Sequence, residues 1–170
     1  MSLVRFKAKN HPQQATRDEV DDRRTPASLF DELNGKHHFT VDAAASQINA
    51  LLPDFWTLET DALVQSWHSQ RVWCNPPYSA IAPWVQKAWN EMEDGCSIVV
   101  MLLPANRCEQ GWWQQFVEPL RDRPAIHGIT LSTQFLPGRL RFAWPTDRVV
   151  PIKGDRPPFG CVLLTWQNHL

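Results

Sequence analysis

The chain has 170 residues, enough for one well-cored domain and short for two. Its formal net charge of −1 argues against general electrostatic attraction to nucleic acid. No apolar stretch approaches the roughly 20 residues of a membrane span, residues 1–24 are too polar for a signal peptide, and the cysteines and histidines show no zinc-binding spacing. We therefore expect a soluble cytoplasmic protein with no membrane partner and no metal.

The charge is unevenly distributed along the chain. Residues 1–100 carry nine Lys and Arg against thirteen Asp and Glu, whereas residues 101–170 carry eight against five. A basic C-terminal half is suited to following phosphates, but chance segregation on a solvated surface explains the same counts. Both interpretations stay open from the sequence alone.

The first 24 residues are polar and charged and are expected to form a flexible arm, which leaves residues 25–170 as a single domain. A helix is predicted to begin with Thr25 as its N-cap and Pro26 in the first helical position. Gly35 is the expected stop. The apolar face of this helix consists of Leu29, Phe30 and Leu33.

The next part of the chain alternates between short apolar runs and loops. The pattern predicts a strand at 39–41 that ends at Asp42, a mostly helical run at 43–52, a strand at 55–58 and a strand at 71–74.

The second half of the domain begins with a predicted helix at 81–92. The continuous apolar run at 97–103 is typical of a strand buried on both faces of a parallel sheet. A helix at about 110–120 follows, and then come strand-like segments only, at 126–131, 139–144 and 160–166, with a turn at Pro137-Gly138. Alternating strands and helices followed by strands alone predict an α/β fold, with a mainly parallel sheet finished by an antiparallel C-terminal edge.

The tetrapeptide Asn75-Pro76-Pro77-Tyr78 directly follows the predicted strand at 71–74. Asn75 offers an acceptor oxygen, two prolines hold the backbone in a set direction, and Tyr78 offers an aromatic face. Together they suit a site that holds a flat substrate by its amine. Ordinary turn chemistry is the alternative, but ligands of open α/β sheets bind at the carboxyl ends of strands, where this motif lies.

Asn-Pro-Pro-Tyr after a strand resembles the catalytic motif of S-adenosylmethionine-dependent amino-methyltransferases. Over residues 25–166 the chain is further similar to the phage-type, Dam-like DNA N-6-adenine methyltransferases. The segments that carry the likeness are Thr25-Pro26, Phe39 to Ala45 with Asn49-Ala50, Thr57 to Leu63 with Trp67, Trp73 to Ser79 with Trp84 and Lys87, Met101 to Ala105, and Leu136 to Phe142.

The resemblance implies a compact class I, Rossmann-like methyltransferase fold that uses S-adenosyl-L-methionine to methylate adenine N6 in double-stranded DNA, with the base flipped out of the duplex. It assigns catalysis to Asn75, Pro76, Pro77 and Tyr78. It assigns cofactor binding to Thr25, Pro26, Asp42, Ala43 and Asp61. The candidate DNA-binding residues, Arg139, Arg141 and Phe142, follow from their own chemistry in the basic half of the chain.

Several of these residues have a structural alternative. Asp42 could simply cap a helix that begins near Ala43, and Asp61 is an acid in a polar loop. Arg139 and Arg141 alternate on a predicted strand, where they would meet DNA or solvent, and Phe142 would stack on the base or fill the core. The stretch Asp42 to Ser46 also lacks the glycine that most class I enzymes place after the first strand.

Two other functions compete with DNA methylation. One keeps the cofactor and changes the substrate to RNA adenine or protein glutamine, and the other is a relative that binds DNA without catalysis. The intact tetrapeptide disfavours the second. A four-base site such as GATC is a family-level expectation. We expect a monomer or weak dimer. So short a chain would read its site through loops of the catalytic domain or through a second subunit.

Overall fold

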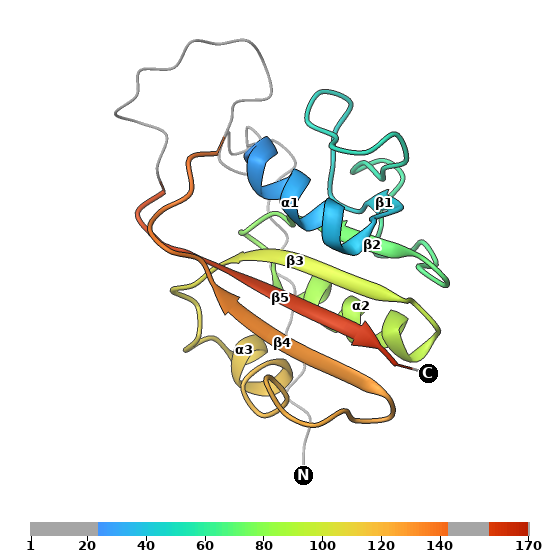
Figure 1. Cartoon of the computed structure of the whole chain (residues 1–170), viewed down its shortest axis with the longest axis vertical. Coiled ribbons are helices and arrows are strands. Elements are labelled where there is room, and N and C mark those ends of the chain that lie inside the picture. The colour runs from blue at the N-terminus through green and yellow to red at the C-terminus, as the bar shows by residue number, and fades with distance from the viewer. Residues whose placement is uncertain (1–23, 143–156, 170) are drawn as a thin grey trace, which may run out of the picture.

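A five-stranded mixed sheet forms the centre of the computed structural model, which describes residues 24–142 and 157–169 (Figure 1). In space the strands lie in the order first, second, third, fifth, fourth. The first three pair in parallel, and the fifth runs antiparallel to both of its neighbours. The predicted α/β class and mostly parallel sheet are confirmed, with the reversed strand one position inside the edge. The strands are β1 (Val41–Asp42), β2 (Arg71–Cys74), β3 (Ile98–Pro104), β4 (Ile129–Phe135) and β5 (Cys161–Asn168).

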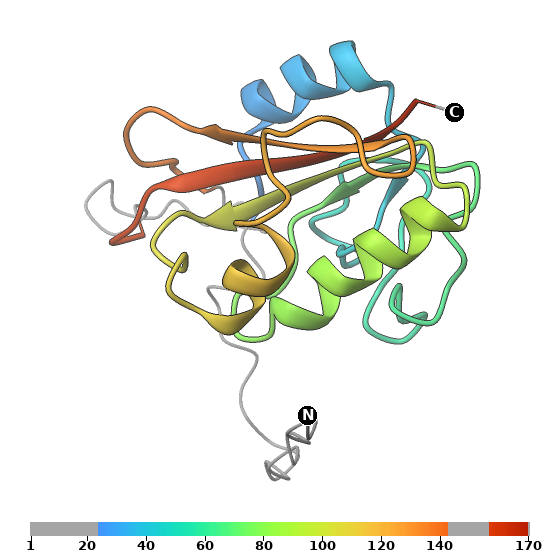
Figure 2. The ribbon, with the colours of Figure 1, turned by 90° about the horizontal axis from the view of Figure 1, so that it is seen from below.

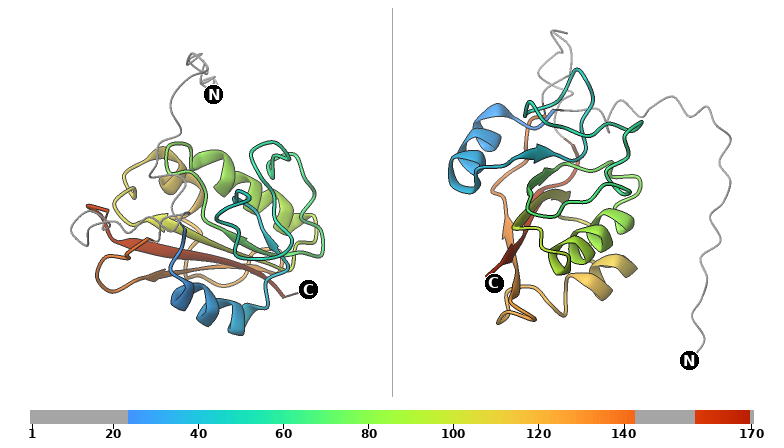
Figure 3. Two further views of the ribbon diagram at one scale, coloured as in Figure 1. Left: turned by 90° about the horizontal axis from the view of Figure 1, so that it is seen from above. Right: turned by 90° about the vertical axis from the view of Figure 1, so that its right-hand side faces the viewer.

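Helices cover both faces of this sheet. The helix α1 (Ala27–His37) lies on one face, and α2 (Ala82–Glu93) and α3 (Gly111–Phe116) lie on the other (Figures 2 and 3). This is a three-layer arrangement with a hydrophobic core on each side of the sheet. The longest of these helices has 12 residues, and within the described ranges no helix is long and apolar enough to cross a membrane.

Strand β3 separates the two cores. All seven of its residues are buried. Because successive side chains of a strand point to opposite faces, Val100 and Leu102 pack with Phe30 of α1, whereas Met101 packs with the cluster beneath α2 that contains Val85. Full burial of a Leu or Val side chain contributes roughly 1.5–3 kcal/mol, so this strand anchors the sheet.

The start and end of α1 differ from the prediction. Thr25 is not its N-cap, because Pro26 occupies the cap position and α1 has no side-chain cap hydrogen bond. The helix also continues past Gly35 to His37. Asn34 closes this end of the helix, because its backbone oxygen accepts the N–H of His38 at 2.8 Å and its side-chain oxygen accepts the N–H of Phe39 at 2.8 Å.

Two segments predicted between β1 and β2 are also wrong. Residues 43–52 form turns instead of a helix, because the Asp42 carboxylate accepts backbone N–H groups from Ala44 and Leu51 and so closes the segment into a loop. Residues 55–58 contribute one isolated bridge, between Phe55 and Asp42, instead of a strand.

The C-terminal elements are shifted or shorter than predicted. The helix expected at 110–120 ends at Phe116, three residues before Pro119, and the strand expected at 126–131 lies at Ile129–Phe135. The predicted turn at 137–138 is present as a bend in which Gly138 has φ +69°. Residues 139–142 lie outside the sheet, and the rest of that predicted strand, 143–144, falls outside the described residues. Of the predicted arm 1–24, only Arg24 is described.

Candidate functional site

The carboxyl ends of β1, β2 and β3 meet at one edge of the sheet. Asp42 pairs with Trp73, two positions before Asn75, and Cys74 pairs with Met101. The acidic residue at the end of β1 and the tetrapeptide after β2 therefore lie at neighbouring strand ends. In Figure 1 the loops that follow β3 and β4 leave the sheet on this same side.

A small pocket lies between the ends of β1 and β2. Its cavity volume is about 10 Å³, room for about one water molecule, and its mouth opens to solvent. The structure thus brings three of the sequence-predicted site residues, Thr25, Asp42 and Asn75, around one pocket. The lining consists of Arg24, Thr25, Asp42, Ala44, Asn49, Leu51, Trp73 and Asn75.

The Thr25 hydroxyl is the least satisfied polar group of this pocket. Thr25 is 2% exposed, and its Oγ1 has no hydrogen-bond partner among the described residues. Burying a hydroxyl without a partner costs about 1–3 kcal/mol, so such a group points to a ligand that supplies the missing bond. Because Thr25 does not cap α1, its hydroxyl lies at the wall of the pocket.

Asp42 has both a structural role and an electrostatic one. Its Oδ1 accepts the N–H of Ala44 at 3.4 Å and its Oδ2 accepts the N–H of Leu51 at 3.1 Å. Burial raises the pKa of Asp42 to about 6, and these two hydrogen bonds together with the charge of Arg24 oppose the rise. The pocket wall therefore carries a carboxylate whose ionised form a nearby positive charge would stabilise.

The tetrapeptide turns from the end of β2 toward a group of aromatic rings. Pro76 is buried, and Asn75, Pro77 and Tyr78 are half-buried. The ring of Tyr78 meets Phe159 edge-on, with centroids 5.9 Å apart, and meets Phe142 edge-on at 6.5 Å. Both contacts fix the plane of the tyrosine ring.

Phe142 packs into the core as well as against Tyr78. It is 6% exposed and belongs to the same hydrophobic cluster as Trp73 and Leu163. Phe142 therefore fills the core, which was one of its two predicted roles. Its contact with Tyr78 also places it beside the tetrapeptide. Arg139 and Arg141 are exposed on the segment that leads to it.

Three predicted cofactor residues do not line the pocket. Asp61 is exposed on a turn with φ +47°, where its Oδ1 accepts the N–H of Leu63 at 3.0 Å. Ala43 is 1% exposed and donates its N–H to the Trp73 carbonyl, and Pro26 is half-buried at the start of α1. Ala44, one residue beyond Ala43, lines the pocket instead.

Sequence reasoning missed Arg24 and Leu51 as lining residues. The guanidinium of Arg24 donates to the Ala50 carbonyl at 3.2 Å and so ties the start of the domain to the loop after β1. Asn49 accepts the N–H of Ser46 at 2.6 Å in the same loop. The segment Asn49-Ala50 carried part of the family resemblance, which was the available signal for this wall.

A buried ion pair on α2 supports the loop that contains Asp61. Lys87 Nζ lies 2.5 Å from Glu91 Oε1 and donates to the Gln65 carbonyl at 2.7 Å. The other carboxylate oxygen of Glu91 accepts the N–H of Trp67 at 2.6 Å. The indole of Trp67 stacks on Trp56, whose backbone N–H donates to the Asp42 carbonyl at 2.9 Å. The helix that follows the tetrapeptide is thereby linked to the pocket wall.

Within residues 24–142 and 157–169, no three His, Cys, Asp or Glu side chains come together in a way that could hold a metal ion. Of the four thiols, Cys74, Cys96 and Cys161 are buried, and burial raises the pKa of Cys96 to about 12 and that of Cys161 to about 11. These thiols are therefore un-ionised and behave as small apolar side chains.

Known proteins identify the family of this chain. A family model described as "DNA N-6-adenine-methyltransferase (Dam)" matches residues 13–159. A protein of Escherichia phage T1 named DNA N-6-adenine-methyltransferase is 38% identical over 104 residues, which cover 60% of this chain and 42% of that protein. A protein of the same name from Haemophilus phage HP1 (strain HP1c1) is 35% identical over 65 residues, 38% of each chain. The matched segments span about two fifths of the length of each relative. Because the family model matches most of the chain, the resemblance in the sequence is confirmed, and this protein belongs to the DNA N-6-adenine-methyltransferase (Dam) family.

Proposed function

We propose that this protein transfers the methyl group of S-adenosyl-L-methionine to the N6 amine of adenine in double-stranded DNA. The observation that carries the proposal is the position of Asn75-Pro76-Pro77-Tyr78 at the end of β2, beside a pocket that Asn75 shares with Asp42 and Thr25. A short site such as GATC is the proposed target.

The tetrapeptide would grip the target amine. The adenine N6 lone pair is delocalised into the ring, which makes this nitrogen a poor nucleophile. The Asn75 side-chain oxygen and the Pro76 carbonyl would accept its two hydrogens at about 2.7–3.2 Å and draw the nitrogen toward a tetrahedral geometry. Tyr78, held edge-on by Phe142 and Phe159, would stack on the purine, a contact worth roughly 1–3 kcal/mol.

The pocket residues fit the cofactor. The Asp42 carboxylate suits the positively charged or hydroxyl-bearing part of S-adenosylmethionine, and the Thr25 hydroxyl has an unused hydrogen-bonding capacity there. Pro26 and Ala43 would shape the wall, and Asp61 would meet the adenine of the cofactor if its turn closes over the pocket. When bound, the cofactor supplies a methyl group already activated by the charge of its sulfonium. The residues of the chain then contribute alignment and electrostatics.

DNA would approach the edge where the strands end. The target amine is inside the duplex, so the adenine must be flipped into the site. Arg139 and Arg141 are exposed on the segment that leads to Phe142 and would hold the phosphates around the flipped base.

The decisive experiment incubates the protein with labelled S-adenosylmethionine and unmethylated DNA, RNA or bulk protein, followed by digestion to nucleosides. N6-methyldeoxyadenosine in DNA is the expected product. Label only in RNA adenine or only in protein would show that RNA or protein is the substrate instead of DNA. Binding of DNA without label in any acceptor would show that the protein is a non-catalytic relative.

The variant Asn75→Ala tests the assigned chemistry. We expect methyl transfer to fall by about 100-fold or more, the effect of removing one preorganised hydrogen-bonding group from an active site, while cofactor binding is kept. Asn90→Ala on the exposed side of α2 is the matched control and should retain full activity. If Asn75→Ala loses cofactor affinity and thermal stability to the same degree as activity, Asn75 has a structural role instead.

A further inference from the structure

Arg107 lies on the loop that follows β3, at the same edge of the sheet as the tetrapeptide. Two residues before it, Ala105 donates its N–H to the Gly160 carbonyl at 2.8 Å. Gly160 adjoins Phe159, whose ring lies against Tyr78. The loop that carries Arg107 is therefore tied to the segment that packs against the catalytic tyrosine.

The Nε atom of Arg107 has no hydrogen-bond partner within residues 24–142 and 157–169. Arg107 is half-buried, its Nε is shielded from solvent, and this atom has no hydrogen-bond acceptor among the described residues. Other arginines of similar burial are bonded: Arg71 Nε donates to the His37 carbonyl at 2.5 Å, and Arg121 pairs with Glu118 at 2.9 Å. An unmade bond at a buried donor costs about 1–3 kcal/mol, which an arriving acceptor would recover.

The position of Arg107 selects the acceptor. Arg107 is not among the residues that line the pocket with Asp42, so the carboxylate of the cofactor is not its natural partner. The segment with Arg139 and Arg141 leaves the sheet at the same edge as the loop that carries Arg107 (Figure 1). The acidic residue Glu109, two positions after Arg107, is exposed. A planar guanidinium whose Nε–H has no acceptor in the described part of the chain matches a phosphate, which offers several acceptor oxygens.

We propose that Arg107 binds a backbone phosphate of the DNA beside the flipped adenine. The inference rests on the proposed DNA substrate and adds a residue that positions this substrate from the β3 side. Arg139 and Arg141 would hold phosphates from the β4 side. The flipped base would then enter between two sets of phosphate contacts.

The salt dependence of DNA binding measures this contact directly. Each phosphate that a protein neutralises contributes about 0.9 to the slope of log K against log salt concentration. We expect Arg107→Gln to lower that slope by about 0.9 and to weaken DNA binding about tenfold at moderate salt, the effect of one charge-assisted hydrogen bond. Affinity for S-adenosylmethionine, measured by calorimetry without DNA, should not change.

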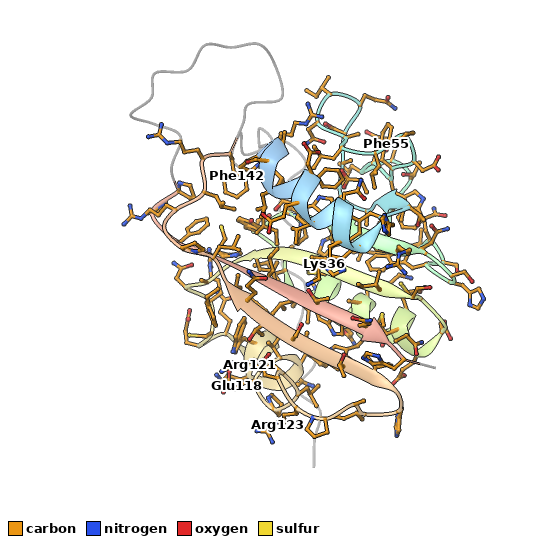
Figure 4. All side chains as sticks on the ribbon, viewed as in Figure 1. Lys36, Phe55, Glu118, Arg121, Arg123 and Phe142 are labelled. Atoms are coloured by element: carbon orange, nitrogen blue, oxygen red, sulfur yellow. The ribbon has the colours of Figure 1, made fainter. Side chains whose placement is uncertain are left out.

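Arg123→Gln is the matched control. Arg123 is exposed and lies far from Phe142, near Arg121 at the opposite end of the molecule (Figure 4). Its replacement should leave the slope and the affinity for DNA unchanged. Arg107→Lys keeps the charge but not the planar fork, so it should keep the slope and lose part of the affinity.

The outcomes separate this inference from the proposed function. If Arg107→Gln leaves the salt-dependence slope unchanged, or lowers cofactor affinity instead of the slope, the phosphate contact is wrong. DNA binding by the wild-type protein would not be contradicted by either result. If Arg107→Gln does not fold, Arg107→Lys decides, because wild-type affinity in this variant contradicts recognition by the planar guanidinium. Failure of the wild-type protein to bind DNA at all would remove the proposed function itself.

Discussion

The buried Asp42 carboxylate should make the folded protein less stable as the pH rises. Its pKa is raised from the ordinary 3.8 to about 6, chiefly by burial. The folded state therefore holds this proton more tightly than the unfolded state, and the free energy of unfolding falls as the pH climbs through that interval. One pH unit of displacement is worth about 1.4 kcal/mol, so the full loss is about 3 kcal/mol.

The variant Asp42→Asn removes this titration. An amide still offers one acceptor oxygen for the N–H of Leu51 or Ala44, and the loss of the second hydrogen bond lowers the stability of the variant by about 1 kcal/mol at pH 4, where Asp42 of the folded wild type holds its proton. The wild type should lose about 2.5 kcal/mol relative to the variant between pH 4 and pH 7.5. Urea unfolding followed by tryptophan fluorescence at several pH values measures the difference, because groups that titrate in both proteins cancel.

Parallel stability curves for the two proteins would refute this reasoning, since they would show that Asp42 titrates alike in the folded and unfolded states.

A second experiment tests whether the same carboxylate interacts with the proposed cofactor. A positively charged ligand stabilises the ionised form, so binding of S-adenosylmethionine near pH 6 should release a proton in the wild type and none in Asp42→Asn. Calorimetry in buffers of different ionisation enthalpy counts that proton.

Two further substitutions test the supports of the site. Glu91→Ala breaks the buried ion pair on α2 and removes the acceptor of the Trp67 N–H, so it should cost about 3–5 kcal/mol in chemical unfolding, whereas Glu118→Ala at an exposed pair should have a smaller effect. A loss no larger than that of Glu118→Ala would show that the pair is dispensable. Gly95→Ala places a Cβ 2.8 Å from the His68 ring in a backbone with φ +97°, and should cost more than about 1 kcal/mol. Adding His68→Ala should recover the steric part of that loss, and no recovery would assign the whole effect to the backbone.

The parts of the fold that the sequence predicted well are those with a local physical cause. β3 is a continuous apolar run, and the helix predicted at 81–92 lies at Ala82–Glu93. β2 was placed without error, because Val72 to Cys74 form an apolar run and two prolines shortly after it stop the strand. The neighbouring strand ends then brought Asp42 and Asn75 to one pocket, as parallel pairing requires.

The parts that were missed depend on distant contacts. The run from Ala43 to Leu52 has helical composition, but the buried Asp42 carboxylate binds its backbone and imposes turns. A strand was expected at 55–58, but this segment forms a single bridge. The indole of Trp56 stacks on Trp67, a contact that a local sequence pattern cannot reveal. Arg107 gave no signal in the sequence, because the lack of an acceptor for its Nε among the described residues is visible only in the folded chain.

The place of β5 in the sheet sets the order in which this protein can assemble on the ribosome. β5 lies between β3 and β4 and forms a seven-residue ladder with each of them. While a nascent chain has been made only as far as β4, that strand has no partner and β3 exposes an unpaired, wholly apolar edge. The sheet closes only when β5 has emerged as well, so β4 joins the sheet after the strand that follows it in the chain.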